Sequence, residues 1–349
     1  MEASATTTAG GGRSALERSP LSRLPDQLTQ WGLSALAVLL LLLIAYFFVR
    51  LIGKSELAFS HFGINFIFGN NWNPAAANGV GFFNALPLLV GTLVTSAIAL
   101  LIGVPVAVAT ALFLTELCPR RARGPLGMLV DLLAAVPSVV YGLWGVFVLA
   151  PKLQGFEKWI ANTFSFIPFI GGAADQVNAS GNYFIAGLIL AIMILPIVSA
   201  ISREVLRTVP PEHKEAALAL GATRWEMIRM AVLPYARPGV TGGAMLGLGR
   251  ALGETIAVVL VIGDSDTLGK HIFDQGYTLA AVIANEFGEA ANQPLHSSAL
   301  FAAGLVLFVL TLIVNAVARW FVTRGTRGIR GAGTGGAMPG GAVAVGVEE

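Results

Sequence analysis

The chain has 349 residues, of which 55% are hydrophobic and 12% charged, with a mean hydropathy of +0.73. A water-soluble domain could not hide that much apolar surface in one core, so the composition predicts an integral membrane protein. The net charge of +2 gives no support for a nucleic-acid partner. The single cysteine excludes an internal disulfide, and the four dispersed histidines give little support for a metal site.

The two ends of the chain differ from the rest in composition. Residues 1–30 are rich in Ala, Thr, Gly and Ser, which predicts a disordered cytoplasmic arm. The apolar run that follows is longer than the core of a signal peptide, so we expect a retained anchor. Residues 323–349 are predicted to form a flexible cytoplasmic tail, and residues 31–322 to form the membrane domain.

Six apolar runs are long enough to cross a bilayer, which takes about 20 helical residues. A membrane barrel would need short alternating segments, and these runs are continuous. The predicted fold class is therefore all-α, a polytopic protein with about six transmembrane helices. The predicted spans are Trp31–Ile52, Leu86–Leu114, Leu126–Ala150, Tyr183–Ile201, Gly239–Ile262 and Ser298–Val322.

The distribution of Lys and Arg predicts the orientation of these spans. Sixteen of the 22 basic residues fall in the termini and the even-numbered loops, and five fall in the odd-numbered loops. Both termini and the coupling loop 203–237 are therefore expected in the cytoplasm. The outer loop 151–182, with aromatic residues such as Phe156 and Trp159, either lies along the membrane or docks an external protein.

Proline and glycine punctuate several spans. Pro87, Pro105, Pro137 and Pro196 are expected to kink their helices, either as fixed features of the bundle or as hinges. In the fifth span, glycine recurs at every fourth position, at residues 239, 243 and 247. This spacing predicts a face that packs closely against another helix or another subunit.

The sequence between spans four and five predicts a helix, a turn at Gly221 and a second helix, and we call this helix–turn–helix loop the elbow. Pro210 and Pro211 can open the first helix, and Gly221 can end it in a left-handed conformation. Thr223 and Glu226 have capping-box spacing and start the second helix, which Pro234 and Pro238 are expected to close. Such an elbow either rests on the membrane surface or passes force from a partner's groove.

The same loop carries the sequence EAALALG, followed by an LP pair. This pattern resembles the EAA motif of permease subunits of ABC importers, although Ala231 stands where the motif has Ile. The resemblance implies that the loop 207–238 is a coupling helix that docks on an ATPase subunit. The matching residues are Glu215, Ala216, Ala217, Gly221, Leu233 and Pro234.

Three further blocks narrow the resemblance. The segments Asn84–Ala107, Leu132–Gly145 and Gly249–Gly263, taken together, resemble PstC-type permeases of phosphate ABC transporters. The resemblance implies a type I (MetI-like) permease fold in a bacterial cytoplasmic membrane. It also implies a second homologous permease, two ATPase subunits that use ATP and Mg, and an external phosphate-binding protein.

We expect no catalytic site, metal or cofactor in the chain itself. The segment Gly263–His271 has five residues between its glycines and His after the Lys, so it does not fit a phosphate-binding loop. Motifs of intramembrane enzymes are also lacking, since the chain has no paired histidines and no Gly-x-Ser-x-Gly elbow. ATP hydrolysis is therefore assigned to a partner.

Arg250 and Glu254 stand out because they interrupt the apolar fifth span. Four residues apart on one helix, they would share a face, either as a mutual ion pair or as the lining of an anion path. A guanidinium offers phosphate a fork of donors, and Glu254 can accept a hydrogen bond from a protonated phosphate oxygen, which sulfate lacks. Asn84 and Thr92 are weaker candidates for the path, and Asp131 is expected to pair with Arg120, Arg121 or Arg123.

The sequence therefore predicts the membrane-spanning permease subunit of an ATP-driven inorganic phosphate importer, forming half of the translocation path. A permease for another oxyanion or small solute is the alternative within the same class. A secondary transporter or channel that works without ATP is the alternative from a different class, and it would need no coupling elbow.

Overall fold

The computed structural model describes residues 24–74, 81–171 and 181–330, and in this part of the chain it is almost entirely helical. The helical fold class is confirmed. Two short strands form an antiparallel pair in which Trp72 lies opposite Phe83. The elements are α1 Leu24–Phe62, α2 Asn65–Phe68, β1 Trp72–Asn73, β2 Phe82–Phe83, α3 Leu86–Leu112, α4 Arg120–Leu132, α5 Ser138–Trp144, α6 Ala150–Thr163, α7 Tyr183–Arg207, α8 Pro211–Ala219, α9 Arg224–Met227, α10 Leu233–Leu252, α11 Ile256–Ile262, α12 Leu279–Glu286 and α13 Pro294–Arg330.

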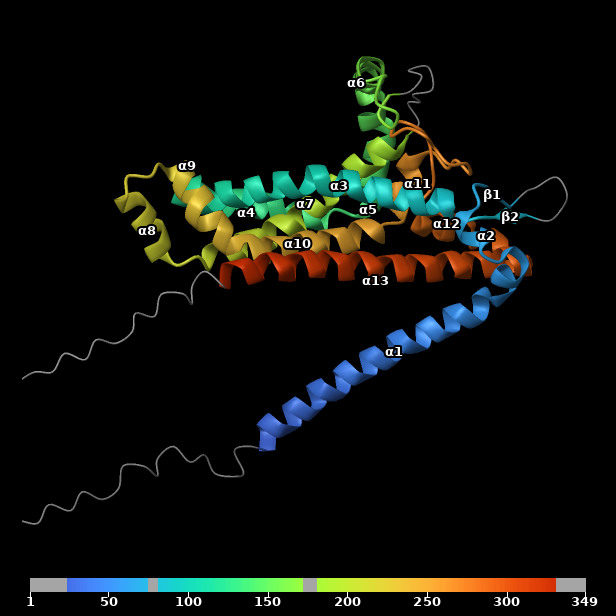
Figure 1. Ribbon diagram of the computed structural model, residues 1–349, viewed down its shortest axis with the longest axis horizontal. Coiled ribbons are helices and arrows are strands. Elements are labelled where there is room, and N and C mark those ends of the chain that lie inside the picture. The colour runs from blue at the N-terminus through green and yellow to red at the C-terminus, as the bar shows by residue number, and fades with distance from the viewer. Residues whose placement is uncertain (1–23, 75–80, 172–180, 331–349) are drawn as a thin grey trace, which may run out of the picture. The chain divides into compact units, whose positions relative to one another are not determined.

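The chain divides into two units, residues 1–53 and 54–349. In the second unit, α3, α7, α10 and α13 run alongside one another, with α8 and α9 at one end and the strands and α12 at the other (Figure 1). Among the described residues, five helices are long and apolar enough to cross a membrane. The bent pair formed by the α9–α10 helix and α11 gives a sixth crossing if it counts as one span, and only then does the number equal the six spans predicted.

The third predicted span, Leu126–Ala150, is wrong in its boundaries. Helix α4 ends at Leu132, a 3-10 turn covers Leu133–Ala135, and a new helix starts after Pro137. Pro137 has an extended backbone, with ψ of 140°, which breaks the run instead of kinking it. The apolar stretch that could cross a membrane is Ser138–Thr163, and its last part, α6, runs across the direction of the other helices (Figure 1).

The fifth predicted span is broken. Helix α10 stops at Leu252, and α11 leaves it at an angle of 66° after three non-helical residues. Glycine at position 253 lowers helix stability there, and a helix can end inside a membrane only where its freed backbone groups find polar neighbours.

The core of the second unit is built on α7, whose contacts reach α3, α5, α10 and α11. The glycine face of α10 packs against it, as the spacing predicts. A Cβ on Gly247 would lie 2.8 Å from Val198 Cγ2, and one on Gly243 would lie 3.1 Å from Ile201 Cγ2. Small residues therefore let two helix backbones approach closely.

The end opposite α8 is held by a buried polar cluster. Trp72 Nε1 donates hydrogen bonds of 2.9 and 3.2 Å to the two carboxylate oxygens of Glu286, and His296 Nε2 lies 2.8 Å from Glu286 Oε2. Burial raises the pKa of the Glu286 carboxyl, while the bonds from Trp72 and His296 lower it. The cluster ties β1, α12 and the start of α13 together.

The predicted arm and tail are partly helical. Helix α1 starts at Leu24 and α13 continues to Arg330, so the helices extend into both regions. The remaining residues, 1–23 and 331–349, lie outside the described residues.

Packing predicts one sensitive glycine. A Cβ on Gly91 of α3 would overlap the backbone carbonyl oxygen of Tyr277, which cannot move as a side chain can. We expect Gly91→Ala to destabilise the purified protein by about 1–3 kcal/mol, measured as a fall in melting temperature in detergent. Gly155→Ala on α6 is the matched control, because its Cβ would meet no atom within 4 Å. Equal stability of the two variants would contradict this packing.

Candidate functional site

The loop after α7 forms the predicted elbow. Helix α8 starts at Pro211, and Gly221 has a φ of +86°, the left-handed conformation expected of it. Thr223 and Glu226 form the predicted capping box, in which the Glu226 carboxylate accepts from Thr223 N at 2.8 Å. Ala222 N also donates to Ala217 O at 3.2 Å, which closes the turn between the helices.

The second helix does not end where prolines were expected to close it. After α9 the chain continues through a π-helical turn, Ile228–Val232, directly into α10. Pro234 lies just after the π-helical turn, Pro238 lies inside α10, and the backbone stays helical past both. The elbow is therefore joined by unbroken helix to the segment that carries Arg250.

The elbow is anchored to the bundle by an ion pair and an apolar cluster. Lys214 Nζ of α8 lies 2.7 Å from Glu116 Oε1 in the π-helical turn that ends α3, and both side chains are largely buried. A buried cluster beneath holds the elbow to the ends of α3, α7 and α10. Its members are Ala111, Leu206, Val209, Met227, Ile228, Val232 and Ala236.

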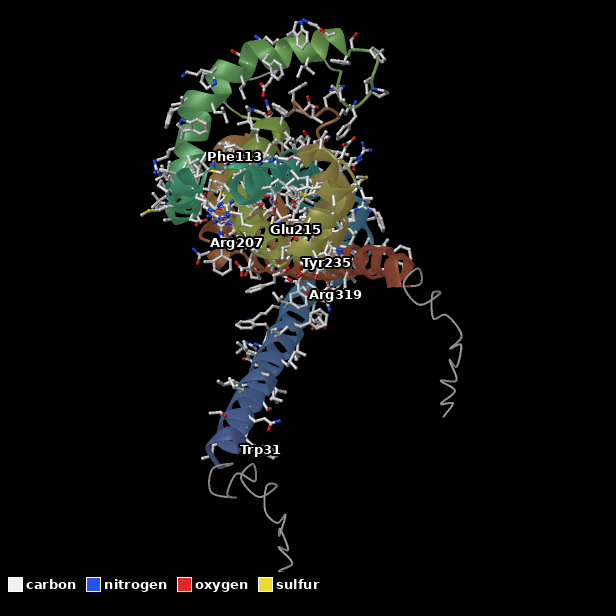
Figure 2. All side chains as sticks on the ribbon, turned by 90° about the vertical axis from the view of Figure 1, so that its left-hand side faces the viewer. Trp31, Phe113, Arg207, Glu215, Tyr235 and Arg319 are labelled. Atoms are coloured by element: carbon white, nitrogen blue, oxygen red, sulfur yellow. The ribbon has the colours of Figure 1, made fainter. Side chains whose placement is uncertain are left out.

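The other side of the elbow exposes apolar side chains. Leu220 is 89% exposed, and Trp225 and Met230 are 65% and 61% exposed. A pocket of about 470 Å³ opens beside them, lined by Ala217, Leu220, Gly221, Ala222, Glu226, Met230 and Ala231. Figure 2 views this end of the bundle, with Arg207 and Glu215 labelled. Exposed apolar residues gathered around a pocket are typical of a protein-binding surface.

The residues that carry the EAA resemblance divide between the two sides of the elbow. Glu215, Ala216 and Gly221 are exposed. Ala217 and Leu233 pack against the buried cluster, and Pro234 is half-buried. The pattern therefore contributes both an outward surface and the contacts that hold the surface in place.

Arg250 and Glu254 do not share one helical face. Arg250 lies in the last turn of α10 and is exposed in the single chain, whereas Glu254 follows the helix end and is 9% exposed. Among the residues that the structure describes, no ion pair joins them. The expectation of one continuous helix was wrong because the helix ends between them, at Leu252.

Arg250 lies near α5. Its charge acts on the Tyr141 phenol, whose hydroxyl donates to Leu133 O at 2.7 Å. In the last turn of α10, the guanidinium also complements the negative end of the helix dipole. Ionised side chains in membrane-spanning segments usually face protein or a polar cavity, and the described residues leave Arg250 exposed.

The two neutral candidates, Thr92 and Asn84, make hydrogen bonds within the chain. Thr92 Oγ1 donates to Leu88 O at 2.7 Å and accepts from Leu279 N at 3.0 Å, which joins α3 to α12. Asn84 is half-buried, and its backbone N–H donates to Asn71 O. Within this chain Thr92 has a structural role, and its part in a path stays a prediction.

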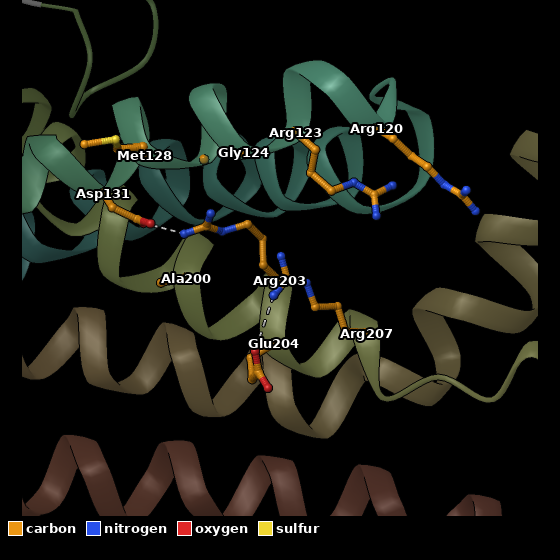
Figure 3. A pocket seen from close by; sticks show the side chains of 10 residues that line it. Arg120, Arg123, Gly124, Met128, Asp131, Ala200, Arg203, Glu204 and Arg207 are labelled. Atoms are coloured by element: carbon orange, nitrogen blue, oxygen red, sulfur yellow. Dashed lines mark hydrogen bonds and ion pairs between the residues drawn. The ribbon is translucent and has the colours of Figure 1, made fainter.

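The expected partner of Asp131 was wrong. Asp131 pairs with Arg203 of α7 instead of an arginine of its own helix, as Figure 3 shows. No local spacing predicts this ion pair, because the two residues are 72 positions apart in the chain. The only sequence signal was the general excess of arginine in this loop and the neighbouring one.

Residues 103–327 match the model of the family described as binding-protein-dependent transport system inner membrane component. The chain belongs to this family. A relative named phosphate transport system permease protein PstC, from Mesorhizobium japonicum, is 45% identical over 83% of this chain and 88% of its own length. A PstC from Pasteurella multocida is 42% identical over 82% and 88%, and a PstC 2 from Mycobacterium tuberculosis is 44% identical over 82% and 87%.

The fold also matches solved permeases. A bacterial alginate ABC transporter, solved with its pentasaccharide-bound periplasmic protein, aligns with a TM-score of 0.57 over 86% of this chain and 98% of its own. A second structure of an alginate importer gives a TM-score of 0.55 over 86% and 99%. At 18% and 19% identity these similarities establish the fold. The PstC-type resemblance and the permease fold are confirmed, and this permease is a multi-pass transport component of the inner membrane.

The anchoring of the elbow predicts a local effect. Replacing Lys214 with Met leaves the largely buried Glu116 carboxylate without its cation, which weakens the hold of α8 on α3. We expect backbone amides of α8 to exchange hydrogen about tenfold faster, because opening would become easier by about 1.4 kcal/mol. Lys152→Met on α6 removes the same charge from an exposed site and serves as control. Unchanged exchange in α8 would contradict the anchor.

Proposed function

We propose that this permease forms half of the translocation path of an ATP-driven importer of inorganic phosphate. A second, homologous permease would complete the path, two ATPase subunits would use ATP and Mg, and an external binding protein would deliver phosphate. The observation that carries the substrate is the similarity to the PstC permeases, at 42–45% identity over more than four fifths of this chain.

The elbow is the proposed docking site of the ATPase. Its outward side exposes Leu220, Trp225 and Met230, of which Leu220 and Met230 line a pocket, and its inward side is fixed to the bundle. An exposed apolar surface whose other side packs on the bundle can bind in a partner's groove and keep its position when the partner moves. Since α9 continues into α10, a displacement of the elbow would reach the helix end at Leu252.

Arg250 is the proposed cation of the path. It is exposed in the single chain, although it belongs to an apolar segment, and a second permease would supply the missing cover. Its guanidinium would hold two phosphate oxygens through a bidentate fork. Glu254, buried beside the helix break, would accept a hydrogen bond from a protonated phosphate and repel sulfate.

The distribution of basic residues supports an orientation with the elbow in the cytoplasm. Sixteen basic residues lie on the side of the termini and the elbow, against five on the other side, and Arg250 completes the 22. Both termini would then be cytoplasmic, and the end with β1, β2 and α12 would face the binding protein. Helix α6, which carries the exposed Phe156 and Trp159, would lie near the outer surface.

Two other functions remain testable. A permease for a different oxyanion or small solute would share the elbow, and competition between labelled phosphate and sulfate in uptake would separate it from a phosphate importer. A secondary transporter or channel would need no docking elbow. It would transport phosphate in vesicles without ATP.

The docking proposal predicts the effect of a charge reversal on the elbow. Glu215→Lys should reduce recovery of the ATPase subunits with the permease by at least about tenfold, because an exposed contact charge is inverted. Glu212→Lys makes the same change one turn earlier, outside the EAA resemblance, and should keep most of the recovery. Phosphate-stimulated ATP hydrolysis by the purified complex should follow the same order. Equal recovery with both variants would contradict docking at Glu215.

The path proposal predicts a separation of transport from assembly. Arg250→Gln should abolish phosphate uptake into vesicles, by at least about a hundredfold, because the phosphate loses the guanidinium partner that this chain supplies in the proposed path. The complex should still contain its ATPase subunits in normal ratio. Arg121→Gln, an exposed arginine outside the span, is the control and should transport normally. Normal uptake by Arg250→Gln would remove Arg250 from the path.

A further inference from the structure

A second basic site lies between α4 and α7, separate from the elbow surface and from Arg250. It is a pocket of about 640 Å³ near the end of the bundle that carries α8, and Figure 3 shows it from close by. Its walls come from the two helices and carry four arginines and two carboxylates. The lining residues are Arg120, Arg123, Gly124, Gly127, Met128, Asp131, Ala200, Arg203, Glu204 and Arg207.

The carboxylates do not balance the arginines. Asp131 pairs with Arg203, and Glu204 lies 3.9 Å from Arg207 in an exposed, weak contact. Arg120 and Arg123 have no carboxylate partner among the described residues. The pocket therefore keeps a net charge of two positive units, and its arginines come from both helices, Arg120 and Arg123 from α4 and Arg203 and Arg207 from α7 (Figure 3).

Two of these arginines also have donors without acceptors. The Nε atoms of Arg123 and Arg203 are buried and make no hydrogen bond in the described chain. Arg123 Nη2 donates to Thr115 O at 2.5 Å, so the guanidinium is held in place while its Nε stays unsatisfied. A buried donor that lacks an acceptor costs free energy, which an oxyanion in the pocket would recover.

The backbone of α4 leaves room for the guanidinium of Arg203. A Cβ on Gly127 would lie 2.8 Å from Arg203 Nη1, so the guanidinium lies close against the helix and would have to shift if the residue were larger. On the same helix, Met128, Leu129 and Leu132 are more than half exposed. Helix α4 thus presents arginines and exposed apolar side chains together, as a helix at the level of lipid headgroups does.

We propose that this pocket binds a phosphate group. The group belongs either to an anionic phospholipid headgroup or to free inorganic phosphate, since a guanidinium pair recognises the same oxygens in both. In the orientation proposed above, the pocket opens at the cytoplasmic surface, where basic clusters beside membrane helices recruit anionic lipids. A bound phosphate bridges α4 to α7 and supplements the Arg203–Asp131 ion pair.

The test compares two double variants of the full permease, purified with its partner subunits and reconstituted in nanodiscs. Arg120→Gln with Arg207→Gln removes two charges from the pocket and leaves the Arg203–Asp131 pair intact. Arg121→Gln with Arg224→Gln removes two exposed arginines that do not line the pocket. Every variant also carries Arg250→Gln, so that phosphate bound in the proposed path does not contribute.

Two probes separate the sources of phosphate. The first arm counts phosphatidylglycerol retained by the protein from nanodiscs of phosphatidylcholine with phosphatidylglycerol. The second arm titrates inorganic phosphate into nanodiscs of phosphatidylcholine alone. We expect the pocket variant to bind at least one of the two probes about tenfold more weakly than the control variant, and the arm that responds identifies the source. Equal binding by both variants in both arms, or no binding by the parent protein in either, would overturn the proposal.

Discussion

The intolerance of a bilayer for unpaired polar groups governs this molecule. Helix α10 stops at Leu252 inside an apolar segment and turns by 66° into α11, which frees carbonyl groups that would otherwise be bonded along the helix. Arg250 lies in that last turn, where its charge compensates the helix end. A helix end and a cation in one apolar segment create a polar position, which in a membrane has to face protein or a polar cavity.

The same helix connects that position to the elbow. From Arg224 to Leu252 the backbone stays helical through a π-helical turn, so a push on α9 is carried along α10. The Lys214–Glu116 ion pair couples α8 to α3 as well, so one elbow holds two of the helices that pack on α7. In the proposed transporter, closure of the ATPases would therefore act on α3 and α10 together, through the continuous helix and the ion pair.

Local rules in the sequence predicted the local features well. The Pro211 start, the left-handed Gly221 and the Thr223–Glu226 capping box each follow from the conformational preferences of a few neighbouring residues. The break between Arg250 and Glu254 was missed, because the apolar residues on both sides of it were taken together as one span of ordinary length, and a single glycine does not by itself predict a helix end. The Arg203–Asp131 pair was missed because its partners lie on different helices, 72 positions apart, beyond any helical spacing.

The surroundings of the two arginine sites explain why the same chemistry can serve different purposes. The pocket between α4 and α7 gathers four guanidinium groups at a surface, where several contacts can hold one phosphate for a long time. Arg250 is the one basic residue of its apolar segment, and a transport path must not bind its anion too tightly. Binding in the path must favour entry of the anion yet allow its departure, and clustered cations would make departure slow. In the proposed path, a single guanidinium with the Glu254 carboxylate close along the chain would meet both demands, and tight binding and most of the selectivity would fall to the external protein of the proposed importer.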